Sequence, residues 1–305
     1  MTAASHPGAA ALAETRRGAI SLVACLVLWC LYPFYFKILG ATSPFEVVAH
    51  RGVWGAVFLM MLVPLVEGWA PFRRAITNPR HLAVLFLTSA LIIGNWLTYV
   101  VVVTDGRVLE ASLGYFLGPL TSVALGVFML KERLTPVQKL AVAIAVVAVL
   151  WLTWSIGRLP LLTLFLATTF SLYGALRKKL PVGPLTGLLV ECLIALPFAM
   201  GYFLWMAGAG GLAFGNGGRT LDLLLLAAGP LTVAPLFFFN FGAKRLNYAT
   251  VGILMYIVPS WLFVAGVWIF GEPLDPDRLI TFVLIWIALA FYTGESVWRA
   301  RRQPA

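Results

Sequence analysis

Charged side chains are scarce in this sequence. Asp, Glu, Lys and Arg make up 11% of its 305 residues and only 12 residues are acidic, whereas hydrophobic residues make up 61%. Soluble domains are usually about 45–50% apolar, so this composition and a mean hydropathy of +0.93 exclude a soluble domain. The uninterrupted apolar runs are about 20 residues long, which suits helices that cross the bilayer rather than the shorter strands of a barrel. The sequence therefore predicts an all-α integral membrane protein.

Cysteine and histidine are equally scarce, with three of each. The cysteines lie inside apolar runs and lack CxxC spacing, which excludes a disulfide framework or a zinc site. There is no HExxH motif, no acidic cluster and no GxxxxGK[ST] loop, so we expect no metal, no cofactor and no ATP-driven cycle. The net charge of +10 comes from short basic clusters between apolar runs, and we expect no nucleic-acid partner.

Ten apolar runs occur along the chain, and we interpret each as a membrane-spanning helix. The first fifteen residues are small and polar and are predicted to be a disordered tail. The run that follows Arg16 and Arg17 is too long for a signal peptide, so the first span is predicted to be uncleaved. The predicted spans are 18–38, 44–66, 82–104, 109–130, 137–155, 159–176, 184–206, 221–242, 248–270 and 278–298.

The distribution of basic residues predicts the orientation of these spans. Lys and Arg near span ends are retained on the cytoplasmic side, and sixteen lie on the side of the N-terminus against five on the other side. Both termini are therefore predicted to be cytoplasmic. The predicted organisation is an N-terminal tail (1–17), a first five-helix repeat (18–155), a second five-helix repeat (156–298) and a basic cytoplasmic tail (299–305).

Two loops that lie 140 residues apart share a sequence pattern. KERLTP (131–136) and GEPLDP (271–276) carry Glu, Leu and Pro at the same spacing, and six of eighteen positions are identical between 119–136 and 259–276. Pro44 aligns with Pro184 at the same offset, and LYPFYFK (31–37) aligns with LYGALRK (172–178) after a shift of one. The halves are therefore predicted to be repeats. Because five spans is an odd number, the second repeat is inverted in the membrane.

Inverted repeats recur in secondary transporters, whose substrate site lies near the midplane between the halves. The architecture predicts a transporter that moves a small organic solute outward by alternating access, the solute being a metabolite, an amino acid or a drug-like compound. The residues leave open proton-coupled against facilitated movement, and also the oligomeric state.

Two other classes of function are the alternatives to a transporter. One is a membrane sensor or scaffold without turnover. The other is an intramembrane enzyme, but its only signal is EASLG around Ser112, which lacks the first glycine of GxSxG. We therefore expect no enzymatic activity.

Ionisable side chains inside the membrane need a cavity or a partner, because each one is unfavourable by about 2.5–3.5 kcal/mol on insertion scales. His50 and Arg51 lie in the second span, and the repeat places Glu191 over Arg51. We predict that Arg51 and Glu191 form an ion pair or two gates across the axis between the halves, with a pair that only fixes helix packing as the alternative. Glu110 begins the fourth span, where a carboxylate stabilises a helix N-terminus, and a role in proton coupling is the alternative.

Aromatic, hydroxyl and amide side chains form the candidate solute site. A cavity lined by such groups suits a neutral, zwitterionic or aromatic solute, held by ring contacts and a few hydrogen bonds. Proline and glycine in the fourth and ninth spans supply candidate hinges, namely Gly118, Pro119 and Pro259. The candidate substrate-binding residues are Trp29, Tyr32, Asn95, Trp96, Tyr99, Ser112, Tyr115, Tyr173, Asn240 and Tyr256.

Four stretches resemble the EamA branch of the drug/metabolite transporter superfamily, and within it the RarD-like members: HRG (50–52), GNWLTY (94–99), EASLGYFLGPL (110–120) and LYGALRKKL (172–180). The resemblance covers residues 18–298. It implies a carrier of the bacterial inner membrane with ten helices in two inverted repeats. It also implies a central cavity formed mainly by spans one, three, four, six, eight and nine, with His50, Arg51 and Glu191 further away.

Overall fold

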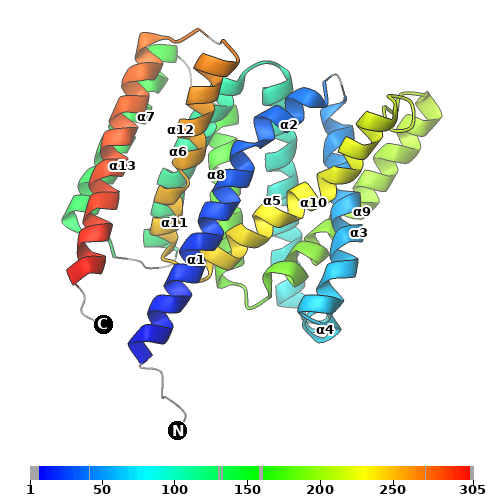
Figure 1. Cartoon of the computed structure of the whole chain (residues 1–305), viewed down its shortest axis with the longest axis horizontal. Helices are drawn as coiled ribbons and strands as arrows, with labels where there is room; N and C mark the ends of the chain where they lie inside the picture. Colours follow the sequence, from blue (N-terminus) through cyan, green and yellow to red (C-terminus); the bar gives the residue numbers. More distant parts are fainter. Residues whose placement is uncertain are drawn as a thin grey trace.

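The computed structural model describes residues 7–40, 42–129, 131, 133–157, 161–271 and 273–302, and within them it is all-helical, without a strand. Figure 1 shows a bundle in which some helices lie in front of others, such as α13 in front of α7 and α12 in front of α6. The first half contains α1 (Pro7–Cys30), α2 (Tyr32–Ile38), α3 (Pro44–Val66), α4 (Trp69–Thr77), α5 (Pro79–Thr104), α6 (Val108–Phe128) and α7 (Pro136–Ile156). The second contains α8 (Leu161–Lys179), α9 (Pro184–Ala209), α10 (Arg219–Ala243), α11 (Tyr248–Leu254), α12 (Ile257–Val264), the π-helix η1 (Ala265–Ile269) and α13 (Pro276–Arg302).

The helices identify a multi-pass membrane protein. Among the described residues, 7 helical stretches are long and apolar enough to cross a bilayer. Two shorter apolar stretches, Gly114–Phe128 in α6 and Leu279–Glu295 in α13, lie within other predicted spans. Large apolar side chains such as Leu65, Phe128 and Trp154 are exposed on the outer faces of the helices, as expected for surfaces that contact lipid. The prediction of ten spans stays a prediction.

Proline begins several helices at positions that recur 140 residues later. α3 and α9 begin at Pro44 and Pro184, and α7 and α13 begin at Pro136 and Pro276. Proline suits the first turn because its fixed φ is helical and its missing N–H has no partner there. In the loops before α7 and α13, Lys131 and Gly271 both have left-handed φ angles, 57° and 69°. The repeated glutamates Glu132 and Glu272 lie outside the described residues.

Three details differ from the sequence-based expectations. α1 begins at Pro7, so the prediction of a disordered tail over the first fifteen residues was wrong for its second half. A short additional helix, α4, connects α3 to α5. The predicted first and ninth spans are each interrupted, at Leu31 between α1 and α2 and at Met255 and Tyr256 between α11 and α12.

Contacts between the halves are reciprocal. α3 packs against α9, and α7 against α13, so equivalent helices of the two halves meet. α1 packs against α10, and the equivalent pair α8 and α5 also packs. α6 packs against α8, and its counterparts α12 and α1 likewise make contact. In Figure 1, α7 and α13 lie at one side of the bundle, α3 and α9 lie at the other, and α1 begins at the same edge at which α13 ends.

Candidate functional site

The two interrupted spans meet at the centre of the molecule. Pro33 in α2 has no N–H to donate to the carbonyl of Trp29, and Pro259 in α12 has none for Met255. The Met255 carbonyl instead accepts from the N–H of Val258 at 3.2 Å. The indole N–H of Trp261 donates to the carbonyl of Cys30, the last residue of α1, at 2.8 Å. Each break therefore follows from a proline, and a side chain of α12 satisfies a carbonyl at the break in span one.

A cavity lies beside these breaks. Its volume is about 40 Å³. This space holds a few water molecules and is too small for a drug-sized solute. The cavity therefore has to widen before an organic molecule enters. Its lining comes from both halves and comprises Trp29, Tyr32, Arg51, Asn95, Trp96, Tyr99, Tyr115, Phe170, Leu236, Met255 and Val258.

Arg51 is the one charged residue of this lining within the described part of the chain. It is 3% exposed, and its Nε donates to the hydroxyl of Thr232 in α10 at 2.9 Å. The guanidinium carbon lies 4.3 Å from the ring centre of Trp96 and 5.6 Å from that of Tyr32. The resemblance implied a position away from the cavity, and for Arg51 that expectation was wrong because α3 packs directly against α10 and α5.

Six of the ten predicted substrate-binding residues lie in the lining: Trp29, Tyr32, Asn95, Trp96, Tyr99 and Tyr115. Two of them also hold helices together. The amide of Asn95 donates to the carbonyl of Leu166 at 2.8 Å and to Thr169 at 3.0 Å. The hydroxyl of Tyr32 donates at 2.6 Å to the carbonyl of Leu231, which Pro235 in α10 leaves without a helical donor.

The other four predicted substrate-binding residues lie outside the lining. Tyr173 and Asn240 belong to a separate buried network. Ser112 donates to the carbonyl of Pro259 at 3.2 Å, and the ring of Tyr256 packs 6.0 Å from that of Phe116. Apolar lining residues such as Phe170 and Met255 were missed, because nothing in an apolar run separates a cavity face from a packing face.

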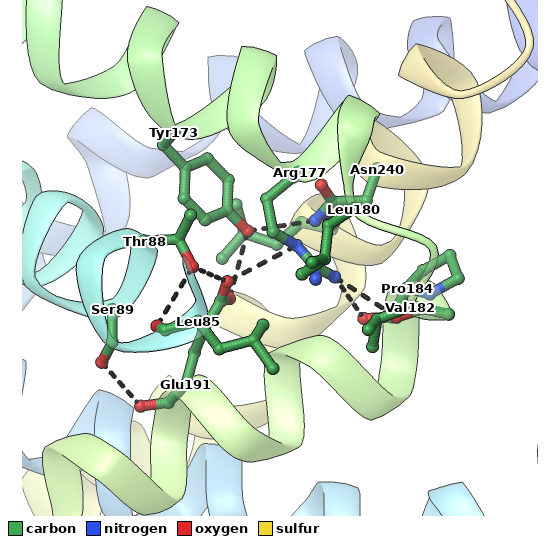
Figure 2. Close-up of polar contacts among 12 residues, drawn as sticks. Leu85, Thr88, Ser89, Tyr173, Arg177, Leu180, Val182, Pro184, Glu191 and Asn240 are labelled. Carbon is green, nitrogen blue, oxygen red and sulfur yellow. Dashed lines mark hydrogen bonds and ion pairs between the residues drawn. The ribbon is translucent and has the colours of Figure 1, made fainter. Parts of the chain in front are cut away.

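The buried network surrounds Glu191 of α9 (Figure 2). Arg177 of α8 and Glu191 are 0% and 3% exposed, and the Nε of Arg177 lies 3.4 Å from a carboxylate oxygen of Glu191. Thr88 of α5 donates to the Glu191 carboxylate at 2.7 Å, and Tyr173 of α8 donates at 3.3 Å. Asn240 of α10 donates to the Tyr173 hydroxyl at 3.1 Å. The predicted ion pair between Arg51 and Glu191 was wrong, because Glu191 pairs with Arg177 instead, and the alternative of two gates stays a prediction.

Cations also hold the turn between α8 and α9. Arg177 donates to the carbonyls of Gly183 and Pro184, both at 3.3 Å. Lys244, which follows α10, donates to the carbonyls of Leu180 and Val182. Burial lowers the pKa of Lys244 to about 8. Basic residues that the sequence analysis counted only as markers of orientation thus tie three helices together.

The remaining candidates for coupling and hinge roles lie at separate places. His50 accepts a hydrogen bond from Trp54 at 2.8 Å and lies 3.8 Å from a carboxylate oxygen of Glu46. It is not part of the lining. The side chains of Glu110 and Pro119 lie outside the described part of the structure. α6 continues through Gly118, whereas its counterpart is interrupted just before Pro259, so a break occurs in only one of the two equivalent spans.

Comparisons with known proteins identify the family. The EamA-like transporter family matches residues 16–154 and 158–294. The chain belongs to this family. An uncharacterised transporter of Pseudomonas aeruginosa is 42% identical over 295 residues, which cover 96% of this chain and 98% of that protein. Protein RarD of Salmonella typhi is 37% identical over 290 residues, which cover 95% of this chain and 99% of that protein.

The fold of this EamA-family chain also has a counterpart among solved structures. A crystal structure superposes with a TM-score of 0.66, covering 94% of this chain and 99% of that chain. The two sequences are 19% identical, so the likeness extends to the fold alone.

Proposed function

We propose that this member of the EamA-like transporter family is a secondary transporter of the bacterial inner membrane. It exports a small organic solute through the central cavity. The chain forms two inverted five-helix halves with both termini in the cytoplasm, and these halves rock about the cavity to give alternating access. The two separate matches to the family and the reciprocal contacts between the halves support this arrangement.

The observation that carries the proposal is the position of the cavity. Its lining residues come from α1, α2, α3, α5 and α6 of the first half and from α8, α10 and α12 of the second, together with Met255 at the break in span nine. A site between two repeats is where a rocking motion exposes a solute to each side in turn. The small volume supports a closed conformation that opens when the halves move.

Replacing Trp29 with leucine tests whether solute passes through this cavity. Trp29 lines the cavity and its ring packs 5.3 Å from that of Phe170. Loss of one aromatic contact with a solute is worth about 1.4 kcal/mol, or roughly tenfold in affinity. We expect transport at low solute concentration to fall roughly tenfold. The measurement is uptake of radiolabelled amino acids, aromatic metabolites and chloramphenicol into proteoliposomes, with and without a pH gradient.

Trp154→Leu is the matched control, because Trp154 lies on the outer face of α7 and is 75% exposed. It should transport like the wild type. Equal loss in both variants would count against the cavity as the route. A solute that binds to purified protein but never crosses the liposome membrane would favour a sensor over a transporter.

A further inference from the structure

Arg51 is a buried cation without a counterion. No described carboxylate lies within ion-pairing distance of its guanidinium, and its buried Nη1 has no hydrogen-bond partner. Its hydrogen bond to Thr232 uses Nε. A charge in a low-dielectric interior is strongly unfavourable unless it is paired and hydrogen-bonded. Arg51 therefore retains donors for a group that the protein does not supply.

Arg177 is a second buried arginine, and it provides a comparison for Arg51. Arg177 faces Glu191 and two backbone carbonyls. Its Nε and Nη1 also lack a hydrogen-bond partner, so the two arginines differ in their counterion and not in having unpaired donors. The repeat places Arg51 at the position equivalent to Glu191. Glu191 in the second half has a charged partner from the protein, whereas Arg51 in the first half has none among the described residues. Only the unpaired one lines the cavity. This contrast separates Arg51 from a charge that merely joins helices.

The surroundings of Arg51 indicate the chemistry of the missing partner. A guanidinium presents a planar fork of donors that matches the two oxygens of a carboxylate. The described lining supplies no second cation, so the single positive charge balances a monoanion rather than a doubly charged phosphate. Apart from Asn95, the rest of the lining is aromatic or apolar, with Tyr99, Tyr115 and Phe170 among it, which suits an apolar or aromatic body.

We propose that the central cavity binds an organic monocarboxylate, with its carboxylate on the guanidinium of Arg51 and its apolar or aromatic body against the rings of the lining. This proposal rests on the proposed transport function and names the substrate class. It narrows the neutral, zwitterionic or aromatic solute predicted from the sequence to an anion.

Matched pairs of ligands test the proposal. Each pair is an acid and its primary amide, which share a body and differ in charge: 3-phenylpropionate, indole-3-acetate and hexanoate, each with its amide. Binding to the purified full chain in detergent is measured by calorimetry at neutral pH. We expect the acid to bind roughly 10- to 100-fold more tightly than its amide in at least one pair, the range for a hydrogen bond to a charged group.

Arg51→Gln should remove the preference for the acid, and Arg51→Lys should retain part of it, because lysine keeps the charge but not the planar fork. Arg299→Gln, which alters a largely exposed arginine on α13, should leave the preference unchanged. The melting temperature of Arg51→Gln should equal or exceed that of the wild type, because the variant no longer buries an unpaired charge. A clearly lower melting temperature, or no preference for the acid in any pair, would overturn the proposal.

Transport assays separate this proposal from the proposed function. Movement of the amides or of other solutes without movement of the acids would overturn the anion site and leave the transporter intact. Binding of an acid that depends on Arg51, without movement into liposomes, would uphold the anion site and refute transport.

Discussion

Replacing Arg177 with methionine is expected to destabilise the protein by about 3–5 kcal/mol, the usual effect of removing one partner from a buried ion pair. Arg177 is fully buried against Glu191, so the variant leaves the buried carboxyl group without a cation. The carbonyls of Gly183 and Pro184 at the start of α9 each lose the hydrogen bond from Arg177, although the N–H of Gly187 still donates to Gly183. The measurement is thermal and denaturant unfolding of the purified protein in detergent.

The exposed pair of Arg299 and Glu295 provides the control. Its atoms are 2.6 Å apart, but Arg299 is 54% exposed, and exposed pairs in helices contribute only about 0.3–0.5 kcal/mol. Arg299→Met should therefore change stability very little. The double variant Arg177→Met with Glu191→Leu should recover most of the loss, because it removes both buried charges. Similar stabilities for Arg177→Met and Arg299→Met would show that the buried pair is not needed.

Replacing Gly229 with alanine is expected to destabilise the protein by about 3 kcal/mol, the upper end of the usual range for overpacking. Gly229 lies where α10 crosses α3, and a Cβ there would lie 2.3 Å from the carbonyl carbon of Trp54 and 2.7 Å from the nitrogen of Gly55. These are backbone atoms, so no side chain can turn aside and the helices must separate. Since Thr232 and Arg51 lie on these two helices, binding in the cavity should be lost as well.

Gly201→Ala in α9 is the matched control. A Cβ at this position meets no atom within 4 Å, and alanine is the better helix former by about 0.8–1.0 kcal/mol. Its melting temperature should equal or exceed that of the wild type. Unfolding curves for both variants, with size-exclusion profiles in the same detergent, check the prediction. A Gly229→Ala protein as stable as Gly201→Ala would mean that the two helices are not in close contact.

Much of the fold could be predicted because its signals are local. Helix starts at Pro44, Pro136, Pro184 and Pro276 depend on the fixed φ of proline, and the apolar runs depend on the thickness of a bilayer. The interruptions within spans one and nine were harder to predict from the sequence. Pro259 was recognised as a hinge candidate, but the break in span one beside Pro33 was not, although both prolines remove a helical hydrogen bond.

The candidate site was predicted in part. Asn95, Trp96 and Tyr99 line one cavity, because residues of one helix face lie together, and their contact with a solute stays a prediction. Tyr173 and Asn240 were assigned to the same cavity on their residue type, but they contact each other in the Glu191 network. Arg177 was missed as a partner of Glu191 because it stands in the basic run RKK, which in a sequence is typical of an exposed cytoplasmic end.

The sequence by itself determined that this protein is helical, that it lies in a membrane and that its halves share a frame, because composition, run length and proline act within one helix or one loop. Only the tertiary structure decided which charges meet. Arg51 and Glu191 occupy equivalent positions in the repeat. Side chains from α8 and α5 reach Glu191 and supply its partners, whereas packing of α3 against α10 and α5 leaves Arg51 at the cavity. The partner of a side chain depends on how helices cross, and that is set by contacts between residues far apart in the chain.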